Sequence, residues 1–389
     1  MTPNDSRLGV NLLHAPASLT GTGHYAQQLI HHLLAKPSSP QIHGFCTQQN
    51  RSRFQLQAEE TAQNRYTLQP WGTPGNSVML RRLEEWFFLE RAIKKAQLNL
   101  FWGPSNFLPW RKVCPYLVSI HDMTFFRDPQ ALGALRRTYW HQWTGRTIAL
   151  ADHIVTVSHA AKADIVHYGK ADPDRITVIY NGTNEAFFLE EKQEGRLQRE
   201  ANLRKKYPKL PQSFVFFLGT LTTHKNVPRL IDAIAQAKKA DGCQAIKLVV
   251  SGKRGFGYEH IQERINHHRL GESVIELGYT EDSDLPALYE AARCHILPST
   301  TEGFGLPITE AMAAGTPTIT GNAGATAEVA GNAALLVDPH RTESIAEALV
   351  ELWRNNDLHA QLRQLGFTRA KTFRWDKAAQ ELLQVVNSM

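Results

Sequence analysis

The most informative segment of the chain for the fold class is Ser299-Thr-Thr-Glu-Gly-Phe-Gly-Leu-Pro-Ile-Thr-Glu-Ala-Met-Ala-Ala-Gly315. It carries two carboxylates, Glu302 and Glu310, in a glycine-bearing approach to a short predicted helix. Pro307 suits the first position of that helix because it has no N–H to lose there, and Gly315 suits its end. The N–H groups at such a helix start have no acceptor within the helix, so they attract anions such as phosphate.

Carboxylates beside a phosphate pocket suit a ligand that also carries pairs of hydroxyls, since one ionised carboxylate accepts two O–H bonds at once. A nucleotide sugar is such a ligand. The alternative is that acidic residues near a helix start stabilise the helix dipole with no ligand present. For Glu310 taken alone this alternative is the more common situation, so the interpretation depends on the rest of the chain.

The composition is that of a soluble globular protein with two domains: 389 residues, 42% hydrophobic and 21% charged. The formal net charge of +6 is spread along the chain, which fits anionic small molecules and gives no support for a nucleic-acid partner. Four cysteines lie far apart without metal-ligand spacing, and we expect them to be reduced in a cytoplasmic protein. No signal segment and no run approaching ~18 apolar residues is present, so no membrane span is expected.

Short apolar runs alternate with helical patterns throughout the second half of the chain. The runs predict strands buried on both faces, at 214–218, 246–250, 274–277, 294–297 and 317–320. This alternation predicts a parallel sheet with helices on both faces, whose ligands bind at the carboxyl ends of the strands. Glycine-bearing polar segments follow three of those ends, at 219–225, 251–257 and 298–306.

The first half shows the same alternation less clearly. Strands are predicted at 7–13, 98–102, 116–120, 153–157 and 176–180, with a helix at 25–34. The charged stretch 186–212 contains the predicted domain boundary. The predicted architecture is therefore α/β, with one domain over 1–190, a second over 191–372, and a cleft between them.

Lys225 is the first basic candidate, in the loop Gly219-Thr-Leu-Thr-Thr-His-Lys-Asn226. A lysine at a helix start is unfavourable for the dipole unless an anion lies nearby. A diphosphate supplies that anion, and Lys225 would neutralise charge on it as it departs. The alternative is a solvated loop lysine. Lys253 and Arg254, at the next glycine-bearing strand end, are either further phosphate contacts or simply exposed.

The first half offers weaker candidates. Gly21-Thr-Gly23 opens a helix and allows close approach of backbone to substrate or phosphate. His121 ends an apolar strand and is expected to face the cleft, although a structural histidine is more common. Asp172 and Asp174 resemble an acidic metal-binding pair, but the proline between them indicates a surface turn, so no metal site is predicted.

The segment from Glu302 to Glu310 matches the E-x7-E signature of retaining GT-B glycosyltransferases. Other segments of the second half resemble glycosyltransferase family 4, in the order of that family: Gly219-Thr220, Lys225-Asn226, 285–289, 297–299, 313–317 and 328–331. The first half resembles the family more loosely, through 21–25, His121-Asp122, Val157-Ser158 and Asn181-Gly182. The resemblance thus covers nearly the whole chain.

The resemblance implies a GT-B fold with two Rossmann-like domains, the first binding the acceptor and the second the nucleotide-sugar donor. A final helix, 373–389, would brace the first domain. Glu302 would contact the donor sugar and Glu310 the ribose. Lys225 would hold the diphosphate, and His121 would face the transferred sugar.

The backbone amides of Phe304, Gly305 and Leu306 would assist Lys225, with no metal and no cofactor. Two departures from the family pattern concern the diphosphate. Many relatives have arginine where this chain has Thr220 and His224. Lys253 or Arg254 is the candidate replacement for the missing charge.

The expected function is retaining transfer of a sugar, mannose first, to a hydroxyl of a glycan or lipid-linked acceptor in polysaccharide or lipopolysaccharide biosynthesis. The expected donor is GDP-mannose, with a UDP-sugar second. A nucleotide-sugar epimerase or phosphorylase, or an inactive sugar-nucleotide-binding subunit, remains an alternative on the same fold. The basic, aromatic segment Arg81–Lys95 leaves weak contact with the inner face of the membrane open, against an ordinary packed helix.

Overall fold

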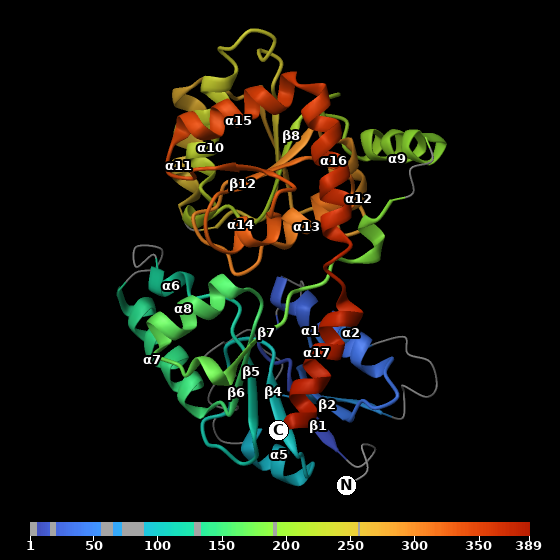
Figure 1. Ribbon diagram of the computed structural model, residues 1–389, viewed down its shortest axis with the longest axis vertical. Helices are drawn as coiled ribbons and strands as arrows, with labels where there is room; N and C mark the ends of the chain where they lie inside the picture. The colour runs from blue at the N-terminus through green and yellow to red at the C-terminus, as the bar shows by residue number, and fades with distance from the viewer. Residues whose placement is uncertain are drawn as a thin grey trace. The chain divides into compact units, whose positions relative to one another are not determined.

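The computed structural model describes residues 6–15, 21–55, 65–71, 89–127, 134–189, 193–255 and 257–389. The chain divides into two compact units, Met1–Gly182 with Trp375–Met389 and Thr183–Arg374 (Figure 1). The division falls at Gly182, before the predicted 190, because the segment that follows packs within the second unit. The Thr183 N–H donates to the Phe373 carbonyl at 3.0 Å, and the Phe187 ring lies 5.9 Å from that of Tyr289.

The sheet of the first unit has, within the described residues, seven parallel strands in the order β3-β2-β1-β4-β5-β6-β7. Their bounds are β1 (Arg7–Asn11), β2 (Gln41–Thr47), β3 (Tyr66–Trp71), β4 (Leu100–Gly103), β5 (Tyr116–Ser119), β6 (His153–Thr156) and β7 (Ile176–Val178). Every residue of β4 and β5 is buried, as expected for central strands covered on both faces. Strands β2 and β3 were not predicted, because polar residues interrupt both runs.

Helices cover this sheet, and the last helix of the chain returns to it. They are α1 (Gly21–Leu34), α2 (Arg51–Phe54), α5 (Glu90–Lys95), α6 (Thr124–Arg127), α7 (Ala134–Leu150), α8 (His159–Gly169) and α17 (Trp375–Ser388). Helix α17 packs against α1, where the Trp375 ring lies 6.2 Å from the Tyr25 ring (Figure 1). Most of the segment Arg81–Lys95 lies outside the described residues, but Leu89 and Ile93 belong to the buried core.

The sheet of the second unit has, in the described ranges, six parallel strands in the order β10-β9-β8-β11-β12-β13. They are β8 (Val215–Leu218), β9 (Leu248–Ser251), β10 (Val274–Gly278), β11 (Cys294–Leu297), β12 (Thr318–Gly321) and β13 (Leu335–Val337). The order reverses between β8 and β11, with β9 and β10 on one side and β12 and β13 on the other. Such a switch point leaves a crevice at the carboxyl ends of the two strands, where ligands of open α/β sheets bind.

The helices of the second unit lie on both faces of its sheet (Figure 1). They are α9 (Gln193–Lys206), α10 (Val227–Ala237), α11 (Tyr258–His267), α12 (Leu285–Ala291), α13 (Leu306–Ala313), α14 (Gly324–Ala330), α15 (Thr342–Arg354) and α16 (Asn356–Ala370). The two parallel-sheet units confirm the predicted α/β fold class. Helix α9 was missed, because it has no apolar periodicity. Arg199 of α9 instead donates two hydrogen bonds, of 2.8 and 2.7 Å, to the Glu290 carboxylate on α12.

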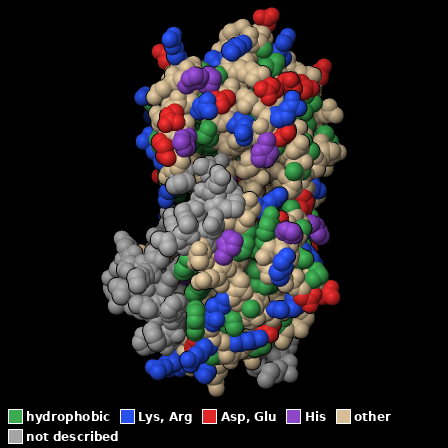
Figure 2. All heavy atoms as spheres, turned by 90° about the vertical axis from the view of Figure 1, so that its left-hand side faces the viewer, with side chains coloured by type: hydrophobic (Ala, Val, Ile, Leu, Met, Phe, Trp, Pro, Cys, Tyr) green, Lys and Arg blue, Asp and Glu red, His purple; other side chains and the backbone are tan. Residues whose placement is uncertain are grey.

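Acidic and basic side chains are interspersed on the face of the second unit seen in Figure 2, in keeping with a mild net charge spread along the chain. All four cysteines lie in described ranges and none forms a disulfide; Cys46, Cys243 and Cys294 are buried and Cys114 is half-buried. Among the helices that the structure describes, none has the length and apolar character to cross a membrane.

Candidate functional site

Lys225 and Glu302 meet at the switch point of the second sheet. Lys225 follows β8 and Glu302 follows β11, and Nζ of the lysine lies 2.6 Å from Oε1 of the glutamate. Only 14% of the lysine and 11% of the glutamate side chain is exposed. Burial opposes ionisation of Glu302 most strongly, but Lys225, the Ser299 hydroxyl and His224 together hold its pKa below the ordinary value. The carboxylate is therefore ionised at neutral pH.

The residues on either side of Lys225 are anchored to the segments that follow β11 and β13. The His224 carbonyl accepts the Thr300 N–H at 3.0 Å. Asn226 Nδ2 donates to the carbonyls of Pro298 at 3.1 Å and Pro339 at 2.6 Å. Asn226 has a left-handed backbone, φ 59°, which asparagine tolerates better than most residues. This role of Asn226 was not predicted, since nothing local in the sequence indicates its distant partners.

The loops after β8 and β9 pair along their backbones. The Leu221 N–H donates to the Lys253 carbonyl at 2.9 Å, and the Gly255 N–H donates to the Leu221 carbonyl at 3.0 Å. A Cβ added at Gly252, whose φ is +148°, would overlap the carbonyl oxygen of Gly219. Close approach of the two loops therefore requires glycine at position 252. Thr220, in the position where relatives carry arginine, is exposed at this edge.

Lys253 and Arg254, the two candidate replacements for that arginine, have different surroundings. Arg254 Nη2 lies 3.2 Å from Glu276 Oε2, and its guanidinium lies over the Tyr258 ring. Lys253 Nζ lies 5.3 Å from the centre of the Tyr279 ring, which is 53% exposed directly after β10. Lys253 is thus the better candidate. Tyr279 was not predicted, although a large aromatic directly after a strand-end glycine is a usable signal.

Glu310 lies on α13, the helix that follows Glu302. The helix begins after Gly305, whose φ of +94° favours glycine. Pro307 has no N–H and the Ile308 N–H donates to the Gly305 carbonyl at 2.9 Å, so the amides that could face a ligand here are those of Gly305 and Leu306. The Tyr289 hydroxyl donates to Glu310 Oε2 at 3.0 Å. The Phe304 ring packs edge-on against Phe373 at 5.4 Å, and the residue is only 4% exposed.

The first unit places His121 just beyond β5. Its Nε2 lies 2.8 Å from the Pro104 carbonyl oxygen. Because a carbonyl only accepts, Nε2 carries the proton and Nδ1 is the acceptor of the neutral ring. Burial lowers the pKa of His121, against smaller opposing effects of Pro104 and Asp122, so the ring is neutral at pH 7. Its ring lies 4.6 Å from that of Tyr25 on α1.

The two predicted glycines open the same helix, α1. Gly21 is exposed, and a Cβ added there would meet nothing within 4 Å. Gly23 is buried within α1. Packing within the described chain therefore does not explain Gly21, and close approach to a ligand stays a prediction for both.

Aromatic rings surround the other strand ends of the first sheet. The His14 ring, beyond β1, stacks on the Phe107 ring, beyond β4, at 3.8 Å. Phe107 in turn lies 5.5 Å from Trp140 and 5.8 Å from Trp143, both on α7. This edge is thus aromatic where the edge of the second sheet is charged.

Asp172 and Asp174, for which no metal site was predicted, form a turn in which Asp172 Oδ1 accepts the Asp174 N–H at 3.0 Å. In the part of the chain that the structure describes, no group of three or more His, Cys, Asp or Glu side chains could hold a metal ion.

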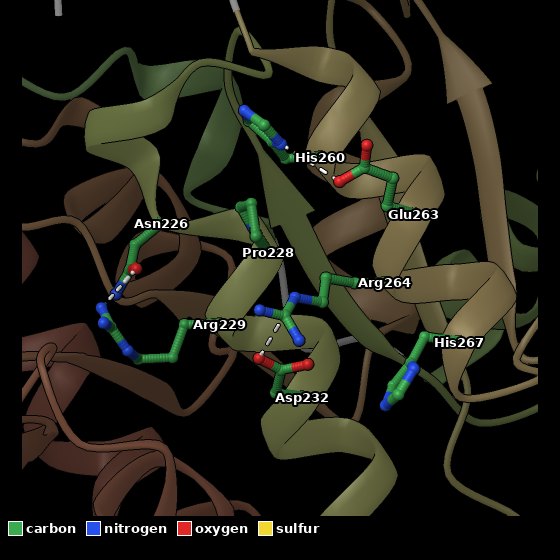
Figure 3. Close-up of a pocket in the computed structure, with 8 residues that line it drawn as sticks. All are labelled: Asn226, Pro228, Arg229, Asp232, His260, Glu263, Arg264 and His267. Atoms are coloured by element: carbon green, nitrogen blue, oxygen red, sulfur yellow. Dashed lines mark hydrogen bonds and ion pairs between the residues drawn. The ribbon is translucent and has the colours of Figure 1, made fainter.

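A surface pocket of about 540 Å³ lies between α10 and α11 (Figure 3). Its arginines have partners: Arg229 Nη1 donates to Asn226 Oδ1 at 2.8 Å, and Arg264 lies 3.8 Å from Asp232. This pocket therefore offers little unbalanced positive charge to a diphosphate. Asn226 and Arg229, which follow Lys225 in the chain, line this pocket.

Comparison with known proteins covers both units. The model of Glycosyltransferase Family 4 matches residues 19–187, and that of Glycosyl transferases group 1 matches residues 198–369. O-antigen chain mannosyltransferase B of Escherichia coli is 25% identical over 374 residues, which cover 94% of this chain and 95% of that protein.

Two solved structures share the fold. Sucrose-phosphate synthase of Thermosynechococcus elongatus superposes with a TM-score of 0.79 at 19% identity, over 99% of each chain. HepE of Anabaena, in complex with UDP-glucose, superposes with a TM-score of 0.73 at 17% identity, over 98% of this chain and 100% of that one. The motif order, the two matching models and the two parallel-sheet units agree: the chain belongs to glycosyltransferase family 4 and has the GT-B fold.

Proposed function

We propose that this glycosyltransferase is a retaining mannosyltransferase that uses a nucleotide-diphosphate donor, GDP-mannose before a UDP-sugar, to extend a glycan in polysaccharide biosynthesis. The similarity to O-antigen chain mannosyltransferase B over nearly the whole length of both chains supports mannose and a glycan acceptor. The observation that carries the proposal is the contact of Lys225 Nζ with Glu302 Oε1, 2.6 Å apart at the switch point.

Lys225 would bind the diphosphate and neutralise the charge that develops as this group leaves the sugar. Its present partner, Glu302, would then accept hydroxyl hydrogens of the donor sugar. The first-turn amides of α13, from Gly305 and Leu306, would add hydrogen bonds to phosphate. We propose that these groups replace a metal ion, so that activity survives a chelator.

The chemical step is proposed to occur on one face of the sugar. The bond from the anomeric carbon to the phosphate oxygen breaks, and a bond to the acceptor oxygen forms on the same face. The departing phosphate oxygen takes the acceptor proton. Glu302 is assigned to positioning rather than to covalent attack, because its carboxylate is proposed to accept hydrogen bonds from the donor sugar.

The nucleoside is proposed to lie along the ends of β9, β10 and α13. Glu310 would accept the ribose hydroxyls. The exposed ring of Tyr279, with Lys253 beside it, offers a stacking surface for the base. The HepE structure holds UDP-glucose on the same fold, which keeps a UDP-sugar as the second donor.

The acceptor is proposed to bind the first unit. A neutral His121 suits hydrogen bonding with sugar hydroxyls, and the rings near Phe107 suit the apolar faces of a glycan. We also propose that the acceptor is lipid-linked and that the protein binds peripherally at the inner face of the membrane. Flotation of the purified protein with anionic vesicles tests that part separately.

A thermal-shift screen against nucleotide sugars tests the donor, since a ligand that binds only the folded state raises the melting temperature. We expect GDP-mannose to give the largest shift and to support transfer to a mannoside acceptor with retained configuration, read by NMR. Change of the sugar in the absence of acceptor would instead indicate an epimerase. Donor binding without transfer to any member of an acceptor panel would indicate an inactive binding subunit.

A further inference from the structure

Tyr289 is a buried tyrosine whose hydroxyl reaches the candidate ribose-binding carboxylate. It lies on α12, and its relative exposure is 0%. Its hydroxyl donates to Glu310 Oε2 at 3.0 Å, across to the neighbouring helix α13. Glu310 itself is half-buried, with Oε2 directed to Tyr289.

The Tyr289 ring is held from several sides. It meets the Phe216 ring edge-on at 5.1 Å, the His295 ring at 5.4 Å and the Phe187 ring at 5.9 Å. The backbone is held too, because Thr316 Oγ1 donates to the Tyr289 carbonyl at 2.6 Å. A ring enclosed in this way has little freedom to rotate, so the direction of its hydroxyl is set by packing.

Helix α12 is fixed from outside as well. Glu290, the residue after Tyr289, accepts two bonds from Arg199 of α9, at 2.8 and 2.7 Å. Such two-point pairs between arginine and a carboxylate are strongly directional. Packing on one side and this pair on the other therefore define where the Tyr289 hydroxyl lies.

The hydroxyl can serve Glu310 only as a donor. Burial raises the pKa of Tyr289 well above its ordinary value, and the nearby Glu310 carboxylate acts in the same direction. The phenol is thus protonated at neutral pH. A carboxylate has two oxygens, so a bond from Tyr289 to Oε2 does not itself engage Oε1.

We propose that Tyr289 is a positioning residue for the donor: its hydroxyl holds Glu310 so that the other carboxylate oxygen is presented to the ribose hydroxyls. This inference rests on the ribose role proposed for Glu310. Without the bond, Glu310 would have more side-chain freedom to lose when the nucleotide binds, at a cost in affinity. We expect the bond to contribute about 5- to 10-fold to nucleotide affinity.

Tyr289→Phe removes the hydroxyl and keeps the ring. We expect the Kd for GDP and UDP, measured by calorimetry, and the KM for the donor to rise about 5- to 10-fold. The kcat should stay within about 2-fold, because the bond acts on binding in the ground and transition states alike. Nucleoside diphosphates without the 2′- and 3′-hydroxyls should bind the variant as they bind the wild type, which a merely structural defect would not produce.

Tyr207→Phe is the matched control. The Tyr207 hydroxyl also donates to a carboxylate, Asp284 Oδ2 at 2.7 Å, in the same unit but outside the proposed donor site. Its loss should lower the melting temperature by an amount similar to that in Tyr289→Phe and leave nucleotide affinity unchanged. Thr316→Val, which frees the Tyr289 carbonyl, should give a smaller rise in Kd of about 2-fold.

A double-mutant cycle with Glu310→Ala separates the two levels of the proposal. The variant Tyr289→Phe/Glu310→Ala should bind nucleotide no more weakly than Glu310→Ala alone. Wild-type affinity in Tyr289→Phe, with Glu310→Ala weakened, overturns the role of Tyr289 and leaves the proposed function standing. Wild-type affinity in Glu310→Ala overturns the ribose role itself.

Discussion

The carboxyl edges of the two sheets are built from different chemistry. At the second sheet, charged groups meet in fixed contacts, Lys225 with Glu302 at 2.6 Å and Tyr289 with Glu310 at 3.0 Å. At the first sheet, His121 is neutral and the neighbouring contacts are between aromatic rings. The same fold class thus presents an edge of paired charged and hydrogen-bonded groups in one unit and an edge of aromatic rings with a neutral histidine in the other.

This difference indicates that the two units have different roles in the proposed reaction. A diphosphate needs compensating charge held in place before it arrives, because reorganising charged groups during the reaction is costly. A neutral sugar needs hydroxyl partners and flat apolar surfaces instead. We therefore expect changes at the second edge to alter nucleotide binding and turnover, and changes at the first edge to alter transfer without altering nucleotide binding.

Lys225→Ala should have the largest effect. We expect kcat to fall about 10²- to 10³-fold, the usual cost of losing one group that stabilises charge in the transition state. Steady-state kinetics with the preferred donor measure it. Lys205→Ala, which removes an exposed lysine from α9, is the control and should be fully active. Full activity of Lys225→Ala would exclude the diphosphate role.

Gly252→Ala tests whether the charged edge depends on close packing of its loops. The new Cβ would overlap the Gly219 carbonyl, so we expect the free energy of unfolding to fall by about 2–3 kcal/mol. Denaturant unfolding measures this. At Gly271 an added Cβ meets nothing within 4 Å, so Gly271→Ala should change stability by less than about 0.5 kcal/mol. Equal stabilities of the two variants would contradict the packing.

His121→Ala tests the aromatic edge of the first sheet. We expect kcat to fall about 10-fold while the Kd for the nucleotide changes less than about 2-fold. Since burial lowers the pKa of His121, its ring stays neutral below the ordinary value of about 6.5, and wild-type activity should be flat from pH 8 to about 6. Weakened nucleotide binding in His121→Ala would break the comparison between the two edges.

His295→Leu should have the smallest effect, and a favourable one. His295 is buried in β11 beneath the charged edge, and neither ring nitrogen has a hydrogen-bond partner among the described residues. Removing an unsatisfied polar group should raise the free energy of unfolding by about 1 kcal/mol at pH 7. Thermal unfolding measures it.

The same variant should also change how the free energy of unfolding depends on pH. Burial, with the charge of Lys225, lowers the pKa of His295 to about 3 in the folded protein. Below about pH 6.5 the unfolded chain binds a proton that the folded protein does not, so stability falls as pH falls. His295→Leu should lose less stability between pH 6.5 and 3 than the wild type.

Much of the second unit was predictable, because its strands are short apolar runs and its helices have strong apolar periodicity. The predicted strands at 214–218 and 294–297 are β8 and β11. The rule that ligands bind at the carboxyl ends of parallel strands made Lys225 and Glu302 candidates, and the resemblance to the family assigned their roles. Helix α9 and the three-residue β13 were missed, since one depends on tertiary ion pairs and the other is too short to show a pattern.

The supporting contacts of the site were not predictable. Asn226 holds the carbonyl of Pro339, 113 positions away, and Tyr289 reaches Glu310 from another helix. Neither pair has a local signature, because each depends on the order in which strands and helices pack.

The sequence by itself determined the alternation of strands and helices, the family, and the set of candidate charged residues, since periodicity and motif spacing are local properties of the chain. Tertiary structure alone decided the partners: Lys225 meets Glu302, whereas Arg254 is held by Glu276 and Lys253 turns to Tyr279. The physical reason is that β8 and β11 are neighbours in the sheet although two strands separate them in the chain. Side-chain pairing at the site follows from that strand order, which no local pattern contains.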